Sequence, residues 1–381
     1  MASGKGGERG MRRRQLIGLV AVVAVLVIAG TDAWAFHHFG KNAATKAYPD
    51  DYLNAVACPS AAQWWAVGQT GNAPGGNTLV EARGPLLKHE TAGRWTTVPA
   101  SGLGADGAAL ESIACPGATD CWAVGGDAAK GHTVIEHWQG GAWQPVPAPA
   151  PPGSQLNTVS CASAAACWAT GGTQARSGAA SDLLEQWNGS RWSVVSTVAG
   201  GLQPEAFSCP GGGRCLALGL RDGAAAAASY SGGRWSAVPP PPAAAGRPGA
   251  GAGAAAPLFG CAGPALCLAA FPGGTSLITD AWNGRSWTPV SSSMLAYPVG
   301  LSCSGANGCW LLGMTRKSRP LALHWQQSGA GGWTAVSVPS ARHQGYLSAL
   351  ACGGGCWAVG GKGGTRRNGV PFTNPLIESL S

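Results

Sequence analysis

The sequence contains few charged residues: Asp, Glu, Lys and Arg together account for 11% of its 381 residues. Phe and Tyr are also scarce, with six and five copies, whereas Trp occurs 17 times and Gly 61 times. Few charges, many turn-forming residues and regularly placed Trp favour an all-β repeat protein over a helical one.

Much of the positive charge lies at the N-terminus. The formal net charge is +8, but residues 1–14 contain five of the 25 basic side chains and one of the 17 acidic ones. The remainder therefore has 20 basic and 16 acidic side chains, a net charge of +4. Because nucleic-acid-binding proteins usually carry a dense basic stripe, we expect no nucleic-acid partner.

The N-terminal segment has the features of an export signal or a membrane anchor. A basic tail, residues 1–14, precedes residues 15–36, which contain the apolar run LIGLVAVVAVLVIAG. This run is long for a signal peptide and slightly short for a spanning helix unless the helix extends past Asp32. Since cationic flanks stay in the cytoplasm, we expect a single-pass protein of the cell membrane with an extracytoplasmic domain. Secretion after cleavage near Ala35 is the alternative.

A cysteine motif recurs along the chain. The stretches CPGATDCWAVGG and CASAAACWATGG are near copies, and the first cysteine of the motif occurs seven times, at steps of 42 to 57 residues: Cys58, Cys115, Cys161, Cys209, Cys261, Cys303 and Cys352. Each unit carries four strand-like pieces, such as LESIAC, CWAVGG, TVIEHW and WQPV. This period and composition predict a seven-bladed β-propeller of four-stranded blades.

We expect the propeller to span residues 43–381. The last unit ends after its third strand, at NPLIESLS. Residues 44–58 match the order of features in residues 333–352, where a fourth strand precedes the next motif. We therefore predict that a strand at residues 44–49 is the outer strand of blade 7 and closes the ring.

Twelve cysteines form close pairs, with C-x5-C spacing five times and C-x3-C spacing once: Cys115–Cys121, Cys161–Cys167, Cys209–Cys215, Cys261–Cys267, Cys303–Cys309 and Cys352–Cys356. In an exported chain such pairs predict structural disulfides across hairpins, each contributing roughly 2 kcal/mol. The pairs lack the C-x-x-C spacing and His partners of zinc sites, and we expect no metal. Cys58 has Trp64 in place of a second cysteine, which predicts either a buried thiol or an intermolecular disulfide.

The repeat resembles the kelch type of propeller unit: a strand ending in Gly-Gly, then an aromatic residue, a turn, a Trp and a Val-x-Pro-like ending. Gly125–Gly126 and Gly171–Gly172 match the doublet, and Trp143 matches the fourth-strand Trp. The chain is also similar to exported C-x5-C-W-A-V-G repeat proteins of high-GC bacteria. The resemblance covers most of residues 44–381 and implies a propeller without implying an activity.

Acidic residues recur two positions before the aromatic residue of the third strand, at Glu136, Glu185 and Asp280, with Glu81 and Glu378 at matching places. Turn arginines lie near them in the sequence. We interpret this pattern as a repeated cross-strand ion pair or a solvated face, with paired catalytic carboxylates as the alternative.

The candidate binding residues are basic. Loops between second and third strands lie on one face of a propeller, and they carry cations such as Arg316, Lys317, Arg319, Arg366 and Arg367. This arrangement predicts a cationic rim that binds an anionic polymer of the cell envelope or an acidic protein partner. Solvation of otherwise neutral loops is the alternative interpretation.

These observations favour a non-enzymatic binding scaffold at the cell envelope, without catalytic residues or cofactor. The seven His show no ligand spacing, and most of the five Tyr lie in repeat-equivalent places. A glycan-directed hydrolase similar to sialidase propellers and a structural or assembly factor are the alternatives. We expect the proline-rich segment 239–257 to be a flexible connector.

Overall fold

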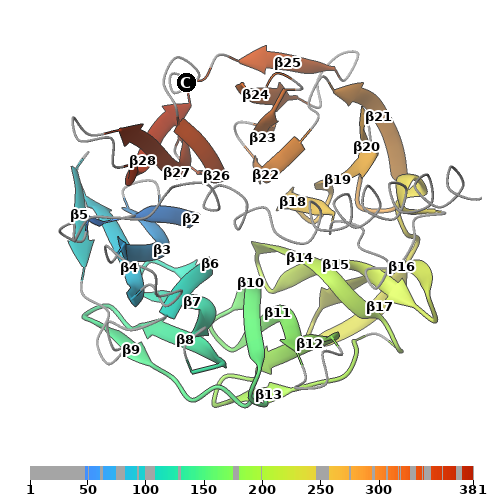
Figure 1. Ribbon diagram of the computed structural model, residues 1–381. Helices are drawn as coiled ribbons and strands as arrows, with labels where there is room; N and C mark the ends of the chain where they lie inside the picture. The colour runs from blue at the N-terminus through green and yellow to red at the C-terminus, as the bar shows by residue number, and fades with distance from the viewer. Residues whose placement is uncertain are drawn as a thin grey trace, which may run out of the picture.

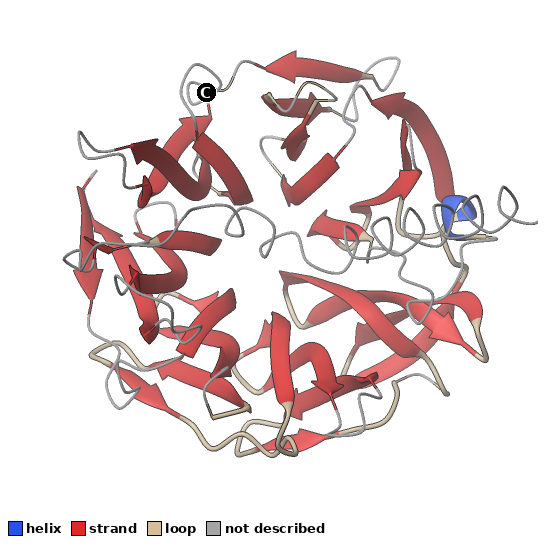
Figure 2. Ribbon diagram, viewed as in Figure 1, coloured by secondary structure: helices blue, strands red, loops and turns tan. Residues whose placement is uncertain are grey.

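The computed structural model is a ring of seven small antiparallel sheets around a central axis (Figure 1, Figure 2). The chain completes one sheet before it starts the next, and the first strand of each sheet lies nearest the axis (Figure 1). The structure describes residues 48–49, 51–60, 63–73, 82–91, 94–98, 108–127, 130–174, 180–198, 200–245, 257–273, 276–293, 297–305, 308–315, 317, 319–326, 332–336, 338, 345–353, 355–365 and 371–380. The predicted all-β, seven-bladed propeller of four-stranded blades is confirmed.

The first four blades consist of consecutive strands. Blade 1 contains β2 (Tyr52–Ser60), β3 (Gln63–Ala73), β4 (Ala82–Thr91) and β5 (Arg94–Val98). Blade 2 contains β6 (Ala108–Gly117), β7 (Asp120–Asp127), β8 (His132–Trp138) and β9 (Trp143–Pro145). Blade 3 contains β10 (Ser154–Ser163), β11 (Ala166–Gln174), β12 (Ala180–Trp187) and β13 (Trp192–Val194). Blade 4 contains β14 (Gln203–Gly211), β15 (Arg214–Arg221), β16 (Ala224–Ser231) and β17 (Arg234–Val238).

The remaining blades follow a short 3-10 helix, η2 (Pro242–Ala244). Blade 5 contains β18 (Leu258–Gly263), β19 (Leu266–Gly273), β20 (Ser276–Trp282) and β21 (Trp287–Ser293). Blade 6 contains β22 (Tyr297–Ser304), β23 (Gly308–Met314), β24 (Pro320–Trp325) and β25 (Trp333–Val336). The described strands of blade 7 are β26 (Gly345–Cys352), β27 (Cys356–Thr365) and β28 (Pro371–Leu380).

The N-terminal strand lies in a different blade from the predicted one. Within residues 44–49, the structure describes β1 (Tyr48–Pro49), which pairs with Asn72 and Ala73 of β3 in blade 1. β3 is longer than β2, so its last residues are open to a second partner. β1 approaches β28 but does not pair with it. The described end of this segment therefore belongs to blade 1 rather than to the outer edge of blade 7.

The expected N-terminal anchor lies outside the described part of the chain, as do the basic tail 1–14 and residues 44–47. Among the described residues, no helix has the length and apolar character needed to cross a membrane.

The first glycine of each doublet allows a close approach of two backbones. Gly125 lies opposite Leu110, where the pairing of β6 and β7 shifts by one residue. A Cβ atom at Gly125 would collide with the carbonyl oxygen of Ala109, and one at Gly171 would collide with that of Gln155. Only glycine leaves room for this approach next to a β-bulge.

Serine side chains join the innermost strands of neighbouring blades. In each contact the serine Oγ accepts a hydrogen bond from a backbone N–H of the next blade, at N···O distances of 2.9 to 3.1 Å: Ser112 from Val159, Ser160 from Cys209, Ser208 from Cys261, and Ser302 from Cys352. Inter-blade hydrogen bonding thus explains the serine directly before the first cysteine in blades 3, 4 and 6, because unpaired buried N–H groups are costly. Ser112 makes the same kind of contact from three residues before Cys115.

Tryptophan side chains fill the space between adjacent blades. Trp122 in β7 is fully buried and stacks on His137 of β8, with ring centroids 3.7 Å apart. It also meets the ring of Trp192 in blade 3 at 5.3 Å. An equivalent stack of Trp65 on His89 lies within blade 1, and Trp65 meets the ring of Trp143 in blade 2 at 5.2 Å. These interfaces are large, rigid and apolar, which fixes one blade against the next.

Disulfides close the turn between the first and second strands in blades 2 to 7, with the six predicted pairings. Their Cα–Cα distances are 3.9 to 4.1 Å, shorter than the roughly 4.5–5.5 Å expected for opposed strand residues. Cys58 lies outside these six bonds, and its thiol donates a hydrogen bond to the Ser60 carbonyl oxygen at 3.0 Å. The Cys58 side chain is half-buried beside Trp64, which agrees in part with the prediction of a buried thiol.

Candidate functional site

The recurring acids of the third strands are buried, which corrects the prediction of a solvated face or an ion pair. Glu136 in β8 and Glu185 in β12 are 0% exposed, and Asp280 in β20 is 1% exposed. None of the three forms an ion pair with a described residue. Burial raises the pKa of both glutamates to about 7 and also raises the pKa of Asp280. Glu378 is half-buried, and Glu81 lies outside the described residues.

Two of these carboxyl groups face the connector that leads into their own blade. The backbone N–H of Ala243 in η2 donates to Asp280 Oδ2 at 2.7 Å. The backbone N–H of Ala150 faces Glu185, where it opposes the effect of burial on the pKa. Residues 239–245 of the connector that we expected to be flexible are thus held against blade 5. The hydrogen bond from Ala243 gives Asp280 a structural role.

The predicted cationic rim is described only in part. Lys317 and Arg319 lie in the loop between β23 and β24, and both are exposed. Arg316, Arg366 and Arg367 lie outside the described residues. The structure therefore describes two of these five residues, and the cationic rim stays a prediction.

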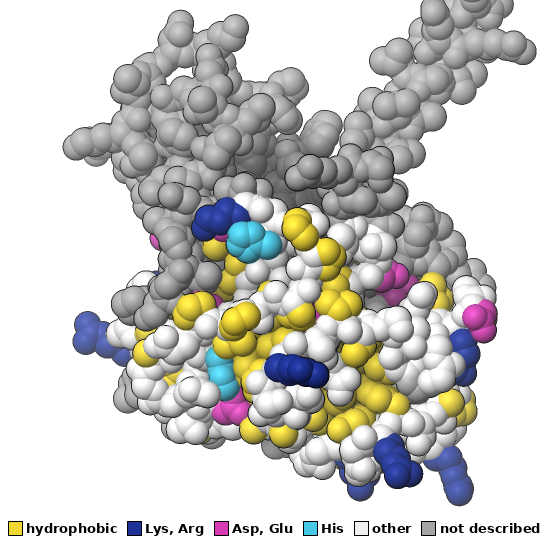
Figure 3. All heavy atoms as spheres, turned by 90° about the horizontal axis from the view of Figure 1, so that it is seen from below, with side chains coloured by type: hydrophobic (Ala, Val, Ile, Leu, Met, Phe, Trp, Pro, Cys, Tyr) yellow, Lys and Arg dark blue, Asp and Glu magenta, His cyan; other side chains and the backbone are white. Residues whose placement is uncertain are grey.

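Exposed arginines gather at the opposite end of the blades. This end consists of two sets of turns: those between first and second strands, which carry the disulfides, and those between third and fourth strands. We call it the disulfide face. Its described arginines are all exposed: Arg94, Arg191, Arg214, Arg234 and Arg285. The described parts of these turns carry one acidic side chain, that of Asp120. Its Oδ1 atom lies 2.7 Å from His137 Nε2. The edge-on view in Figure 3 shows Lys and Arg side chains protruding from the lower edge of the molecule.

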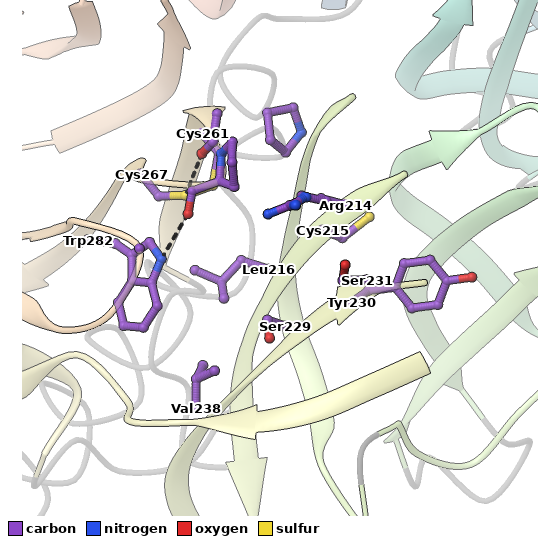
Figure 4. A pocket seen from close by; sticks show the side chains of 14 residues that line it. Arg214, Cys215, Leu216, Ser229, Tyr230, Ser231, Val238, Cys261, Cys267 and Trp282 are labelled. Carbon is purple, nitrogen blue, oxygen red and sulfur yellow. Dashed lines mark hydrogen bonds between the residues drawn. A yellow bond between two sulfur atoms is a disulfide. The ribbon is translucent and has the colours of Figure 1, made fainter. Parts of the chain in front are cut away.

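A pocket of about 140 Å³ opens between blades 4 and 5, beside the disulfides Cys209–Cys215 and Cys261–Cys267. We call it the inter-blade pocket, and six of its lining residues matter here: Arg214, Leu216, Ser229, Ser231, Val238 and Trp282. Figure 4 shows the Arg214 side chain reaching into the pocket, whereas the ring of Tyr230 points away from it. Tyr230 packs instead against Trp168 of blade 3.

The alternation of side chains along β15 and β16 creates this lining. Arg214 and Leu216 lie on the face of β15 that meets blade 5, while Cys215 between them faces blade 3. Ser229 pairs with Leu216, and Ser231 lies two residues further along β16, so both hydroxyl groups share the same face. Two neighbouring strands thus bring a cation, two hydroxyls and an aliphatic side chain to one place.

The pocket lies where blade 4 departs from the packing seen between blades 2 and 3. In blade 2 the residue after the second cysteine is Trp122, and its partner across the strands is His137. In blade 4 the same two positions hold Leu216 and Ser229. Both replacements remove side-chain volume, and the space they leave is not refilled. The dipeptide Cys-Leu replaces Cys-Trp both here and at Cys267–Leu268 in blade 5, so it signals reduced side-chain volume without locating the pocket.

The charge at the pocket is also reversed relative to blade 2. The residue before the second cysteine is Asp120 in blade 2 and Arg214 in blade 4. Asp120 is satisfied by His137 at 2.7 Å, whereas Arg214 has no acidic partner among the described residues. Arg234 follows the turn from Ser231, and Arg285 is adjacent to the lining residue Gly284. Three cations therefore surround a pocket lined by hydroxyl groups and one indole ring.

A second hollow, of about 340 Å³, lies at the opposite end of blade 2 beneath the segment 145–150. Its charged residues Asp127 and Lys130 form an ion pair at 3.1 Å. Burial alone would raise the pKa of Asp127, but the backbone and side chain of Lys130 lower it below its usual value. This hollow already satisfies its own charges, so we regard the inter-blade pocket as the candidate site.

Comparison with known proteins supports the fold. No family model matches the chain, and no curated protein matches its sequence. It is similar in structure to YCF48 bound to D1 peptide, with a TM-score of 0.52 and 13% identity over 91% of this chain and 96% of that one. It is also similar to the β-propeller domain of the Trilobed protease from Pyrococcus furiosus, with a TM-score of 0.50 and 7% identity over 89% and 97% of the chains. The kelch-type resemblance stays a prediction.

Proposed function

We propose that this protein is an extracytoplasmic, non-enzymatic binding scaffold that captures an anionic partner at the cell envelope. One observation carries the proposal: five exposed arginines lie on the disulfide face, where the described acid Asp120 is already bound by His137. Clustered charge of one sign attracts a polyanion and increases its rate of association. The proposal moves the predicted binding surface from the rim loops to the opposite face.

The disulfides support the proposal in two ways. Six structural disulfides suit an oxidising compartment outside the cytoplasm. They also fix the turns that carry the arginines, so a partner would meet a preformed surface and little conformational entropy would be lost on binding. We further propose that residues 15–36 hold the propeller at the membrane. Cell fractionation tests this: protein in the membrane fraction agrees with an anchor, and protein in the medium agrees with cleavage near Ala35.

The binding test uses the full-length protein in nanodiscs of neutral lipid. Capture on immobilised polygalacturonate is compared with capture on dextran, at low and high salt. We expect salt-sensitive capture on the anionic polymer only, because surface charges are screened at high ionic strength. The Arg191→Gln/Arg234→Gln/Arg285→Gln variant should lose most of this capture.

The matched control is Lys317→Gln/Arg319→Gln, which removes exposed cations from the opposite end of the blades. It should bind like the wild type. Loss of capture in the control alone would return the binding surface to the predicted rim. Release of reducing sugars from the polymer would contradict the non-enzymatic role and favour the hydrolase.

A further inference from the structure

We infer that the inter-blade pocket between blades 4 and 5 binds a single acidic sugar residue, with Arg214 holding the sugar's carboxylate. This inference rests on the proposed function, because it assigns the specific contact within a generally cationic face. The pocket of about 140 Å³ is smaller than the roughly 300–1,000 Å³ of sites for drug-sized ligands. It is much larger than the roughly 30 Å³ that one water occupies. One ring-sized group is the ligand that fits.

The charge of the lining indicates an anion. The Arg214 side chain reaches into the pocket, as Figure 4 shows, and Arg214 has no acidic partner among the described residues. A guanidinium group matches a carboxylate through two parallel hydrogen bonds, which makes it selective for planar anions. The neighbouring turns add Arg234 and Arg285, which raise the local concentration of anions without lining the pocket.

The rest of the lining indicates a sugar rather than a bare ion. Ser229 and Ser231 each offer a hydroxyl that can donate and accept, which suits the hydroxyl groups of a pyranose. Leu216, Val238 and the ring of Trp282 line the pocket as well and suit the C–H faces of the sugar ring. An inorganic anion would leave this apolar part of the lining unused.

The pocket is held in shape before any ligand arrives. Trp282 Nε1 donates to the Pro264 carbonyl oxygen at 3.2 Å, which fixes the indole ring. The ring also packs against Trp287 at a centroid distance of 5.3 Å. The Cys261–Cys267 disulfide on blade 5 and the Cys209–Cys215 disulfide on blade 4 hold the two walls. Such a site needs little rearrangement to bind.

The test titrates the full-length protein in nanodiscs with glucuronate, using calorimetry and saturation-transfer NMR. Glucose, methyl glucuronate ester and acetate serve as probes that lack the charge or the ring. We expect saturable binding of glucuronate and binding weaker by about tenfold or more for the three other probes. Equal binding of acetate and glucuronate would overturn the sugar assignment, and the absence of saturable glucuronate binding would overturn the site.

Two variants test the location. Arg214→Gln should weaken glucuronate binding by about tenfold or more, whereas Arg319→Gln, an exposed arginine at the opposite end of the blades, should leave it unchanged. Leu216→Trp introduces the side chain that blades 2, 3, 6 and 7 carry after the second cysteine, and it should abolish binding by filling the pocket. Arg214 is exposed, so Arg214→Gln reports on binding even where Leu216→Trp does not fold. Wild-type affinity in Arg214→Gln would refute the site.

The outcomes separate this inference from the proposed function. Salt-sensitive capture of polygalacturonate without saturable glucuronate binding would leave the cationic scaffold intact and overturn the pocket. Glucuronate binding without capture of any anionic polymer would support the pocket and contradict the proposed scaffold.

Discussion

The buried glutamates make the stability of the propeller depend on pH. Glu136 and Glu185 are 0% exposed, and burial raises the pKa of each to about 7 from 4.5. Between these two values the unfolded chain is ionised while the folded chain keeps its protons. The folded state therefore binds more protons, and the free energy of unfolding falls as the pH rises from about 4.5 to about 7. Above about pH 7 these two glutamates cause no further loss of stability.

The size of the effect follows from the two pKa values. The difference between about 4.5 and about 7 corresponds to about 3 kcal/mol for each carboxyl group. A Gln at either position stays neutral at every pH. We therefore expect Glu136→Gln and Glu185→Gln to resemble the wild type at pH 4 and to exceed it by about 3 kcal/mol at pH 8.

The assay is urea unfolding of the oxidised protein, followed by tryptophan fluorescence at several pH values. The quantity of interest is the difference in unfolding free energy between variant and wild type, because this difference cancels the contributions of other titrating groups. Burial, for example, lowers the pKa of His89. Asp182→Asn is the matched control, since Asp182 is exposed on the same strand as Glu185. A constant difference between Glu185→Gln and the wild type across the pH range would refute the reasoning.

Two further predictions concern the framework of the blades. Gly171→Ala should destabilise the protein by several kcal/mol, roughly the cost of overpacking, because the new Cβ collides with the Gln155 carbonyl oxygen. Thermal unfolding should show little change for Gly172→Ala, where the nearest atom is 3.8 Å away. Replacing Cys161 and Cys167 by Ala should lower stability by about 2 kcal/mol in urea unfolding, and an unchanged midpoint would contradict a structural role for this disulfide.

The sequence predicts the architecture of this protein well because the architecture repeats. Seven copies of one motif locate the blades, and local cysteine pairs can form only within one hairpin. The sequence does not show which blade the N-terminal strand β1 joins. Both candidate partners of β1 are strand edges, and the length of β3 beyond β2 decides between them. Strand lengths at this precision do not follow from composition or spacing.

The burial of the acids could not be read from the sequence either. Alternation along a strand distinguishes a buried from a solvated face only when one face of the sheet meets water. A central blade strand has a neighbouring blade on both faces, so Glu136 and the residues on either side of it, Ile135 and His137, are all buried or half-buried. The pattern TVIEHW therefore contains no signal that separates a buried carboxyl from an exposed one.

Departures from the repeat carry the functional information in such a protein. A Trp beside a stacking His fills the interface between blades 2 and 3, and replacing such a pair by Leu216 and Ser229 costs packing energy. A change that only relaxed the packing would leave an apolar hole. Here the neighbouring position holds an arginine, Arg214, where blade 2 has an acid. Lost volume and reversed charge occur together at one interface between two disulfides, and ligand binding accounts for both, whereas weaker packing accounts for only the first.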